Sequence, residues 1–235
     1  MMQSQLVSIT DLSNADREAM YCLLKHHFSG VTPEVFNQDL ASKNWVILIK
    51  NKERIKGFST LRLYDVTVNG APLSVVYSGD TIVDPSAWSS ATLPRAWIQA
   101  INQLRCPDKP LFWLLISSGF RTYRLLPTFW QDFYPRYDRP TPKTMQTLMD
   151  TLAKQQFGNA YDQDTGIVRF EQPQQLSPIL GTVPPERRSD LHIRFFEQVN
   201  PDHAKGDELV CLTEICAENL TAAGRRMWFG RKLAA

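Results

Sequence analysis

The sequence lacks long apolar runs, closely spaced cysteines and a strong charge of either sign. Its longest apolar run, 111–116, is far shorter than the ~20 residues that span a membrane, and no basic flank precedes an apolar stretch at the N-terminus. We therefore expect neither a membrane span nor a secretory signal. A net charge of +2 gives no reason to expect a nucleic-acid partner, and four cysteines without a CxxC pair indicate reduced thiols and a cytoplasmic protein.

Two kinds of site are disfavoured because their motifs are missing. Four residues could offer zinc ligands: His192, His203, Cys211 and Cys216. Their spacing does not match any standard zinc site, so no metal is expected. No Gly-x-Ser-x-Gly elbow is present, which argues against a serine hydrolase. Basic residues near the C-terminus are interpreted as a solvated tail: Arg225, Arg226, Arg231 and Lys232.

The length of 235 residues allows one large domain or two small ones. The pattern of residues changes after Pro140, and we interpret the whole chain, 1–235, as a single domain with a core at 5–139 and an extension at 140–235. Periodic patterns and turn signals divide the core into elements. We expect helices at 14–28, 33–42, 90–105 and 120–126, and strands at 5–10, 45–50, 54–68, 71–83 and 111–116.

The three strands between 45 and 83 should form an antiparallel meander. Asn69-Gly70 is a strong signal for a tight hairpin, because both residues tolerate the positive φ that the turn requires. The uniformly apolar strand at 111–116 is expected to be covered on both faces. The extension should contain a helix at 141–156, a strand at 167–170, a proline-rich surface loop at 173–188, a helix at 189–199 and a strand at 207–215. The expected helix caps are Asn14, Thr141 and Ser189.

This order of elements resembles that of the GNAT family of N-acyltransferases. The order is strand, helix, helix, three antiparallel strands, helix, buried strand and helix, and the resemblance covers about residues 5–139. The strands at 167–170 and 207–215 would be the last two strands of the family, with helical insertions between them. The resemblance implies an α/β (α+β) fold with a mixed, mostly antiparallel central sheet flanked by helices. It also implies transfer of an acyl group from a thioester to an amine.

Gly79 lies inside the strand at 71–83, where glycine weakens pairing and often marks a bulge. In the family the corresponding strand carries a bulge and diverges from the next one, and the gap admits the pantetheine arm of acyl-CoA. The resemblance therefore implies a gap between 77–83 and 111–117, with Ile82 and Val83 beside the donor. An ordinary twisted strand that uses glycine for packing is the other interpretation.

The loop after this strand departs from the family pattern. The family has arginine or glutamine, two residues, glycine, one residue, then glycine or alanine, where this chain has Ala87, Trp88, Ser89, Ser90, Ala91 and Thr92. N–H groups at a helix start still attract phosphate, and the hydroxyls add donors, but Trp88 and the lack of glycine restrict backbone approach. Two outcomes fit. CoA binds weakly and an acyl carrier protein supplies the acyl-phosphopantetheine, or the site is degenerate and binds no donor.

Three residues are candidates for the chemistry. Asp80 shares its strand face with Val76, Ser78 and Ile82 if the alternation is unbroken; it is either a base or amine anchor, or a structural carboxylate beside the bulge. Tyr123 stands where the family often has a tyrosine that protonates the leaving thiolate, although packing of a helix on the sheet fits equally. Ser117 ends the buried strand, where it either contacts substrate or caps the turn.

Charged and aromatic side chains follow the buried strand. The charged ones either face the phosphates of CoA or an acidic carrier protein, or form a solvated face paired with Asp132 and Asp138: Arg121, Arg124, Arg136, Arg139 and Lys143. We assign Arg124 to the donor-binding set. The aromatic ones either line a pocket for a long acyl chain or belong to the core: Phe129, Trp130, Phe133, Tyr134 and Tyr137.

The sequence thus predicts an N-acyltransferase that moves an acyl group, with fatty acyl groups included, to an amine of a small molecule or peptide. Acyl-CoA or acyl-phosphopantetheine on a carrier protein is the expected donor. The alternative is a catalytically degenerate GNAT-like binding module for a carrier protein or peptide. No oligomeric state is predicted.

Overall fold

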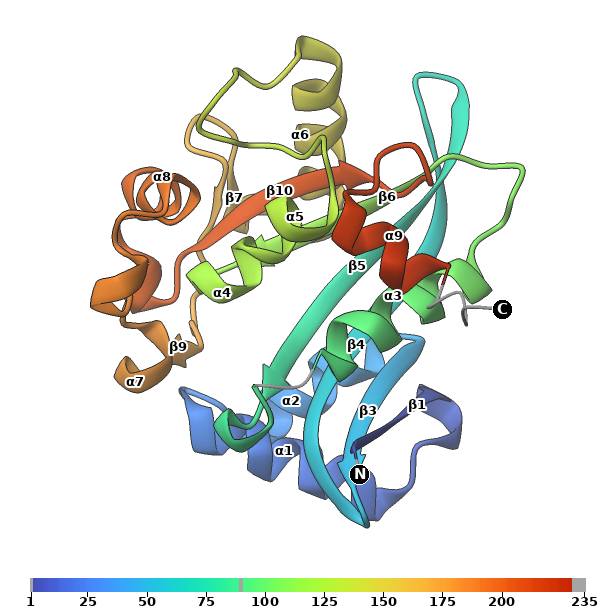
Figure 1. Cartoon of the computed structure of the whole chain (residues 1–235), viewed down its shortest axis with the longest axis vertical. Helices are drawn as coiled ribbons and strands as arrows, with labels where there is room; N and C mark the ends of the chain where they lie inside the picture. Colours follow the sequence, from blue (N-terminus) through green and yellow to red (C-terminus); the bar gives the residue numbers. More distant parts are fainter. Residues whose placement is uncertain (1, 89–90, 230–235) are drawn as a thin grey trace.

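A mixed sheet forms the centre of the molecule in a computed structural model, which describes residues 2–88 and 91–229 (Figure 1). Within these residues it has eight strands in the order β1-β3-β4-β5-β6-β10-β8-β7, and all neighbours are antiparallel except β5 and β6. The strands are β1 (Met2–Ser8), β3 (Trp45–Asn51), β4 (Arg54–Val68), β5 (Ala71–Val83), β6 (Leu111–Ser117), β7 (Tyr161–Asp162), β8 (Ile167–Val168) and β10 (Glu208–Glu214). The expected mixed, mostly antiparallel sheet is confirmed.

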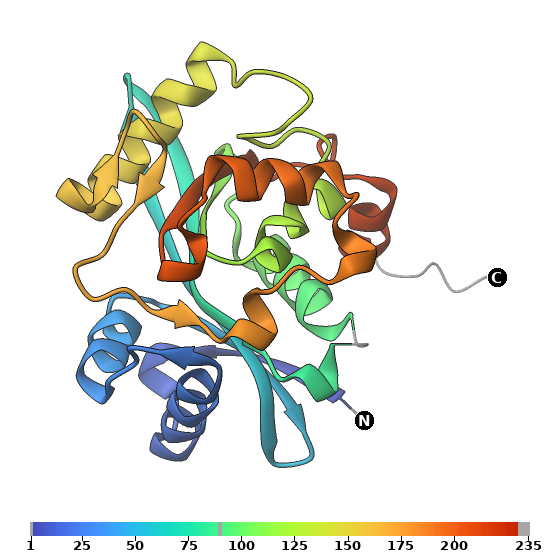
Figure 2. The ribbon, with the colours of Figure 1, turned by 90° about the vertical axis from the view of Figure 1, so that its left-hand side faces the viewer.

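Helices cover both faces of this sheet (Figure 2). The face that we call the α6 face carries α1 (Asn14–His27), α2 (Pro33–Ala41) and α6 (Lys143–Phe157). The opposite face, called the α3 face, carries α3 (Thr92–Leu104), α4 (Phe120–Tyr123), α5 (Leu125–Phe129), α8 (Leu191–Val199) and α9 (Ala222–Trp228). Among the described residues no helix has the length and apolar character needed to cross a membrane.

Alternation along the strands produces this two-sided core. On β3, Val46 and Leu48 pack with α1 and α2, whereas Ile47 and Ile49 pack with α3. On β6 every residue is buried, because helices cover both of its faces, as expected from its continuous apolar sequence. The C-terminal strand β10 pairs with β6 and β8, which confirms the two late strands.

The hairpin between β4 and β5 follows its local sequence closely. Asn69 and Gly70 have φ values of 51° and 81°, the left-handed conformation that the two-residue turn needs. The boundaries of both strands match the prediction. The starts of α1 and α2 match the prediction, and those of α3, α6 and α8 lie two residues later than predicted. The predicted caps Asn14, Thr141 and Ser189 are wrong, and the residues that precede the three helices are Ser13, Pro142 and Asp190.

Much of the segment 173–188 lies at the surface, as predicted, but it is not a plain loop. It contains β9 (Gln175–Leu176), which pairs with β2 (Phe28–Ser29), and the short helix α7 (Pro178–Gly181). Its polar and proline-rich composition predicted exposure, but the few aliphatic residues decide its position: Leu180 and Val183 are buried in the core. The segment therefore covers part of the molecule near the open end of β5. The remaining short turns are η1 (Ile9–Asp11), η2 (Pro85–Ala87), η3 (Gly158–Ala160), η4 (Pro185–Arg187) and η5 (His203–Lys205).

Candidate active site

An extra residue in β5 creates a bulge at 79–80. Ser59 and Leu61 on β4 are two residues apart, whereas their partners Thr81 and Ser78 on β5 are three residues apart. Two residues of β5 therefore oppose one residue of β4, which is the arrangement of a β-bulge. The bulge predicted from Gly79 is confirmed.

The bulge inverts the alternation of side chains along β5. Before it, Ser78 points to the α3 face, where its hydroxyl contacts Trp97. After it, Asp80 points to the α6 face, where Lys43 is one of its charged neighbours. The expectation that Asp80 shares a face with Val76 and Ser78 is wrong, because it required unbroken alternation. The inversion moves the carboxylate to the opposite side of the sheet.

Gly79 is required by close packing as well as by the bulge. A Cβ atom at this position would collide with the side chain of Lys43 and would lie 2.6 Å from Thr60 Oγ1. The side chain of Lys43 is fully buried, so it has no free space into which to retreat. Only glycine leaves room for the side chains of Lys43 and Thr60 this close to the backbone of β5.

The strands β5 and β6 separate directly before the bulge. Their parallel ladder runs from Ser74 opposite Leu111 to Ser78 opposite Leu115 and then ends. The edge of β5 at 79–83 consequently faces an opening instead of a neighbouring strand. The predicted gap between these two strands is confirmed.

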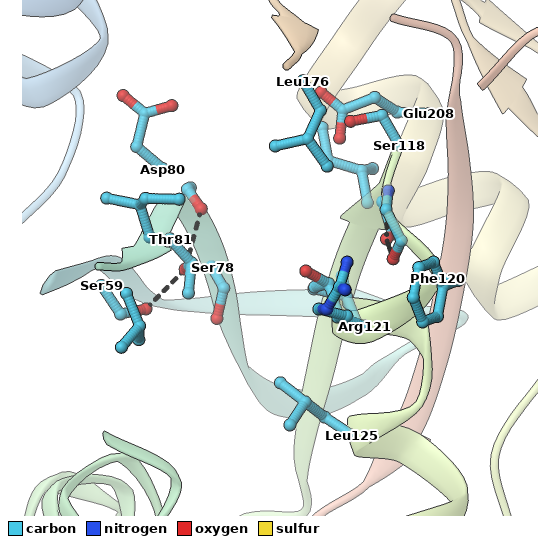
Figure 3. Close-up of a pocket in the computed structure, with 18 of the residues that line it drawn as sticks. Ser59, Ser78, Asp80, Thr81, Ser118, Phe120, Arg121, Leu125, Leu176 and Glu208 are labelled. Carbon is cyan, nitrogen blue, oxygen red and sulfur yellow. Dashed lines mark hydrogen bonds between the residues drawn. The ribbon is translucent and has the colours of Figure 1, made fainter. Parts of the chain in front are cut away.

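A cavity of about 1180 Å³ occupies this opening (Figure 3). Its lining comes from both faces of the sheet, so the cavity passes through the sheet where the strands part. Asp80 and Glu208 lie at one end, on opposite sides of the gap, and Leu125 lies toward the other end. The volume exceeds the roughly 300–1,000 Å³ of most small-molecule sites, so the cavity can hold a large substrate or two substrates.

Two carboxyl groups define the α6-face end of the cavity, which we call the carboxyl end. Burial raises the pKa of Asp80 to about 7; the nearby Asp39 carboxylate reinforces this shift and Lys43 opposes it. Burial also raises the pKa of Glu208 to about 8, reinforced by Asp80 and Asp39. Among the described residues, none forms a hydrogen bond or ion pair with either carboxylate. Both groups are therefore poised to exchange protons near neutral pH.

Lys43 is the nearest cation, but its donors are already used. Its ammonium donates to Asp39 Oδ1 at 2.6 Å, to the Asp39 carbonyl at 3.2 Å and to Ser42 Oγ at 2.9 Å. An ammonium has three N–H donors, so these contacts exhaust them. Lys43 consequently neutralises Asp39, and within residues 2–88 and 91–229 no cation is bonded to Asp80 or Glu208.

Tryptophans from the α3 face line the other side of the cavity, and we call this part the tryptophan end. Ser78 Oγ accepts hydrogen bonds from Trp97 Nε1 at 3.2 Å and Trp113 Nε1 at 2.9 Å. The ring centroids of Trp97 and Trp113 are 4.4 Å apart, and those of Trp113 and Trp130 are 5.0 Å apart. The hydroxyl of Ser78 thus fixes an apolar wall directly beside the bulge.

Replacing Ser78 with alanine should destabilise the protein. Ser78→Ala leaves two buried indole N–H groups without their acceptor, and each unsatisfied donor costs about 1–3 kcal/mol. We expect the free energy of unfolding, measured by urea titration, to fall by roughly 2–4 kcal/mol. Ser74→Ala on the same strand is the control, because its hydroxyl contacts the exposed Asp65. Equal losses in the two variants would contradict this assignment.

The described part of the loop between β5 and α3, residues 84–88 and 91, offers few donors to a phosphate. Trp88, which lines the cavity, donates from Nε1 to the Val83 carbonyl at 2.9 Å, and Ala91 precedes α3 without a side-chain cap. Pro94 is the third residue of α3 and has no N–H group. Of the predicted donor-binding residues, Ile82, Val83, Trp88 and Arg124 line the cavity, Ala91 and Thr92 are not part of its lining, and Ser89 and Ser90 lie outside the described residues.

Arginine side chains gather near this loop. The guanidinium of Arg121 lies 4.5 Å from the ring centre of Trp88 and donates to the Leu180 carbonyl. Burial lowers the pKa of Arg121, and the neighbouring positive charge of Arg187 lowers it further. Arg124 forms an ion pair with Asp190 at 3.1 Å. All three arginines line the cavity, so the site is positive on this side and acidic at the carboxyl end.

The rest of the predicted basic and aromatic sets divides between the cavity and other parts of the fold. Arg136 and Arg139 pair with Asp132, and Arg136 also pairs with Asp138, as the solvated-face interpretation expects. Phe129 and Trp130 line the cavity, whereas the other three predicted aromatics do not: Phe133, Tyr134 and Tyr137.

Tyr123 and Ser117 occupy different environments. Tyr123 is fully buried outside the cavity lining, burial raises its pKa, and its hydroxyl donates to the Pro135 carbonyl at 3.0 Å. Ser117 does line the cavity, but its hydroxyl donates to the Gly119 carbonyl and accepts the Gly119 N–H. The roles predicted for these two residues stay predictions, and the structure does not bring Tyr123 together with Asp80 in the cavity.

Glu208 is the site residue that the sequence reasoning missed. It begins the apolar strand β10 and lies on the same strand face as Val210 and Leu212, which pack on the α6 face. An acid at the inward position of such a strand is a usable signal of function. Its proximity to Asp80 could not be read from the sequence, because the two residues are distant along the chain and meet only through β6.

The strand order and the separation of β5 from β6 give this chain a GNAT-like fold. No protein-family model and no curated protein matches the sequence. A conserved protein of Enterococcus faecalis V583 described as a probable N-acyltransferase aligns with 92% of this chain and 67% of its own, at 9% identity and a TM-score of 0.42. The GNAT family N-acetyltransferase YhbS of Escherichia coli, solved in complex with CoA, aligns with 55% of this chain and 69% of its own, at 13% identity and a TM-score of 0.38. ElaA of Escherichia coli aligns with 60% of this chain and 95% of its own, at 17% identity and a TM-score of 0.38.

Proposed function

We propose that the protein is an acyl-CoA-dependent N-acyltransferase in which Asp80 accepts the proton of the acceptor amine. One observation carries the proposal: a carboxyl group with a pKa of about 7 lies at a bulge beside an unpaired strand edge, in a cavity that passes through the sheet. The strand edge supports a thioester donor, and the carboxyl group supports an amine acceptor. The cavity allows the two substrates to approach from opposite faces of the sheet.

The pantetheine arm is proposed to lie along the open edge of β5. Asp84 N–H donates to the Lys56 carbonyl on β4, so by alternation the main chain of Val83 and Thr81 faces the opening. The Val83 carbonyl already accepts from Trp88, which leaves Thr81 as the group available for pairing. A phosphate between Arg121 and Arg187 would relieve the repulsion between these two cations. Acyl-phosphopantetheine on a carrier protein offers the same arm and one phosphate.

The proposed reaction forms one bond and breaks one. The acceptor ammonium gives a proton to Asp80, and the neutral amine nitrogen attacks the thioester carbon. Collapse of the tetrahedral intermediate breaks the C–S bond, forms the amide and releases the thiolate of CoA. The attacking nitrogen loses its second proton as the amide forms. The proton held by Asp80 goes to the thiolate and the second proton goes to solvent, so the sum is an amide, a free thiol and one released proton. Main-chain N–H groups on the open edge of β5 are the proposed donors to the oxyanion.

The size of the tryptophan end favours long acyl groups over acetyl. The proposed function is tested directly by incubating the protein with an amine and acyl-CoAs of increasing chain length and measuring the rate of thioester loss. We expect kcat/KM to rise with chain length by up to about tenfold for each well-buried pair of methylenes, until the cavity is filled. Failure of every acyl-CoA and acyl-phosphopantetheine to bind or react would overturn the enzyme and favour the binding module.

A variant that narrows the cavity tests where the acyl chain lies. Leu125 lines the cavity on the α3 face, and Leu125→Trp places a larger ring there. We expect kcat/KM for a long-chain acyl-CoA to fall at least about tenfold, with a much smaller change for acetyl-CoA. Leu191→Trp is the control, because Leu191 is 49% exposed and does not line the cavity. An equal loss for both donors would show that the chain lies elsewhere.

A further inference from the structure

The carboxyl end of the cavity contains one more acid than the proposed reaction uses. Asp80 receives the amine, and Asp39 is bonded to Lys43. Glu208 also lines the cavity, but among the described residues it has no hydrogen-bond or ion-pair partner. Glu208 is half-buried on the inward face of an apolar strand, where an acid without a partner destabilises the fold, so its presence indicates a ligand group that it meets.

Tyr77 provides a second, independent indication of a ligand at this end. It is only 5% exposed and lines the cavity, yet within the described residues its hydroxyl has no hydrogen-bond partner. Its ring packs against Phe157 at 5.5 Å, and Lys43 Nζ lies 5.2 Å from the ring centre, so the ring is held in place. The hydroxyl oxygen of Tyr77 can therefore accept a hydrogen bond from an N–H group of a ligand, and the nearby carboxylates favour a ligand that is cationic.

Two strands, β5 and β10, and the end of α2 place these groups on the same face of the sheet. Tyr77 precedes the bulge on the α6 face, and Asp80 follows it on that face. Glu208 reaches the same face from β10, on the other side of the gap (Figure 3). All four residues, Asp39, Tyr77, Asp80 and Glu208, line the cavity, and the acids raise the pKa of the Tyr77 hydroxyl.

Resting on the proposed function, we infer that the acceptor is a dibasic amine, whose reacting nitrogen lies at Asp80 and whose second cationic nitrogen binds Glu208 and the Tyr77 hydroxyl. Two cationic nitrogens joined by a short aliphatic linker match two carboxylates that have no bonded cation among the residues that the structure describes. The linker would lie in the gap between β5 and β10. A monoamine would leave Glu208 unpaired.

Calorimetry on the whole protein without any acyl donor tests this inference. The probes are α,ω-diamines of several lengths and n-alkylamines of the same lengths. We expect the best diamine to bind about 10- to 100-fold more tightly than its matched monoamine, the range of one charge-assisted hydrogen bond. Glu208→Gln should remove most of this preference, and Tyr77→Phe should reduce it by a few-fold. Glu214→Gln, at the exposed end of the same strand, should keep it.

Proton release gives a readout that loss of packing would not change. Near pH 7, Glu208 is largely protonated in the free protein, because its pKa is about 8. The titratable groups that the structure places beside it are Asp39, Asp80 and Tyr77. Diamine binding should therefore release more protons than monoamine binding, as measured in buffers of different ionisation enthalpy, and Glu208→Gln should abolish the difference.

Equal affinity for diamines and monoamines in the unaltered protein, or a preference that survives in Glu208→Gln, would overturn the inference. Thermal unfolding of each variant shows whether it is folded before the comparison is made. Failure of the proposed function looks different: diamines would bind with the expected preference while no acyl donor reacts. Turnover of monoamines and diamines at equal kcat/KM would keep the acyltransferase and remove the second cation site.

Discussion

Asp80→Asn is expected to lower kcat/KM for acyl transfer by about 100- to 10,000-fold, the usual range for loss of a general base. The amide has the same shape as the carboxyl group but cannot accept a proton from the acceptor ammonium. A pKa of about 7 suits Asp80 to act as a base at neutral pH. A large fraction of its carboxyl group is then ionised, and the carboxylate is basic enough to accept the proton of the acceptor ammonium. Thioester loss under saturating donor measures the effect.

The same residue should control the pH profile. With a base of pKa about 7, kcat/KM should be low in acid and rise as the pH increases through about 7. The ionisable groups that face Asp80 are Asp39, Lys43, Glu208 and Tyr77. Glu208 has a pKa of about 8 and is largely neutral at the midpoint, so Glu208→Gln should leave the midpoint near 7. Asp65→Asn is the matched control, because Asp65 pairs with Lys109 away from the cavity. A flat profile, or an Asp80→Asn variant that retains most of its activity, would remove Asp80 from the mechanism.

The double variant Asp80→Asn/Glu208→Gln should be more stable than the parent protein at alkaline pH. Burial raises the pKa of Asp80 from 3.8 to about 7 and that of Glu208 from 4.5 to about 8. The folded state therefore holds more protons than the unfolded state between these limits. The parent loses stability as the pH rises through this window, and the loss is complete above about 8.

We expect the double variant to gain roughly 2–4 kcal/mol above this window and little below it. The full shifts would correspond to more, but both carboxylates face the cavity, where solvent reduces the effect. Urea unfolding at the two ends of the pH range measures the difference, and Glu214→Gln serves as the control at an exposed position. A variant that is less stable than the parent at both pH values would contradict the burial of two unneutralised acids. The gain would also show that these acids are retained for function at the expense of stability.

The meander shows what local sequence can specify. Asn69-Gly70 permits the left-handed turn, and the flanking alternation sets the boundaries of β4 and β5. Gly79 within β5 predicted the bulge, because glycine weakens the pairing of a strand and is common where a strand bulges. The opening between β5 and β6 followed from the resemblance of the element order to the GNAT family.

Segment 173–188 shows where local sequence is not sufficient. Composition predicted a surface loop, but Leu180 is buried, and the same segment helps to line the cavity. Two buried aliphatic residues gave too weak a signal against four prolines and many polar residues. Whether such a segment is covered depends on the surface that the rest of the chain offers to it.

By itself, the sequence determined the elements, the hairpin, the bulge and the presence of an acid at Asp80, because each depends on residues that are neighbours along the chain. Only the tertiary structure decided which face Asp80 occupies, since one extra residue in β5 inverts every later side chain. It also decided that Glu208 and Tyr77 meet Asp80 at one end of a cavity. Such meetings arise from sheet pairing between distant segments, and no local pattern records them.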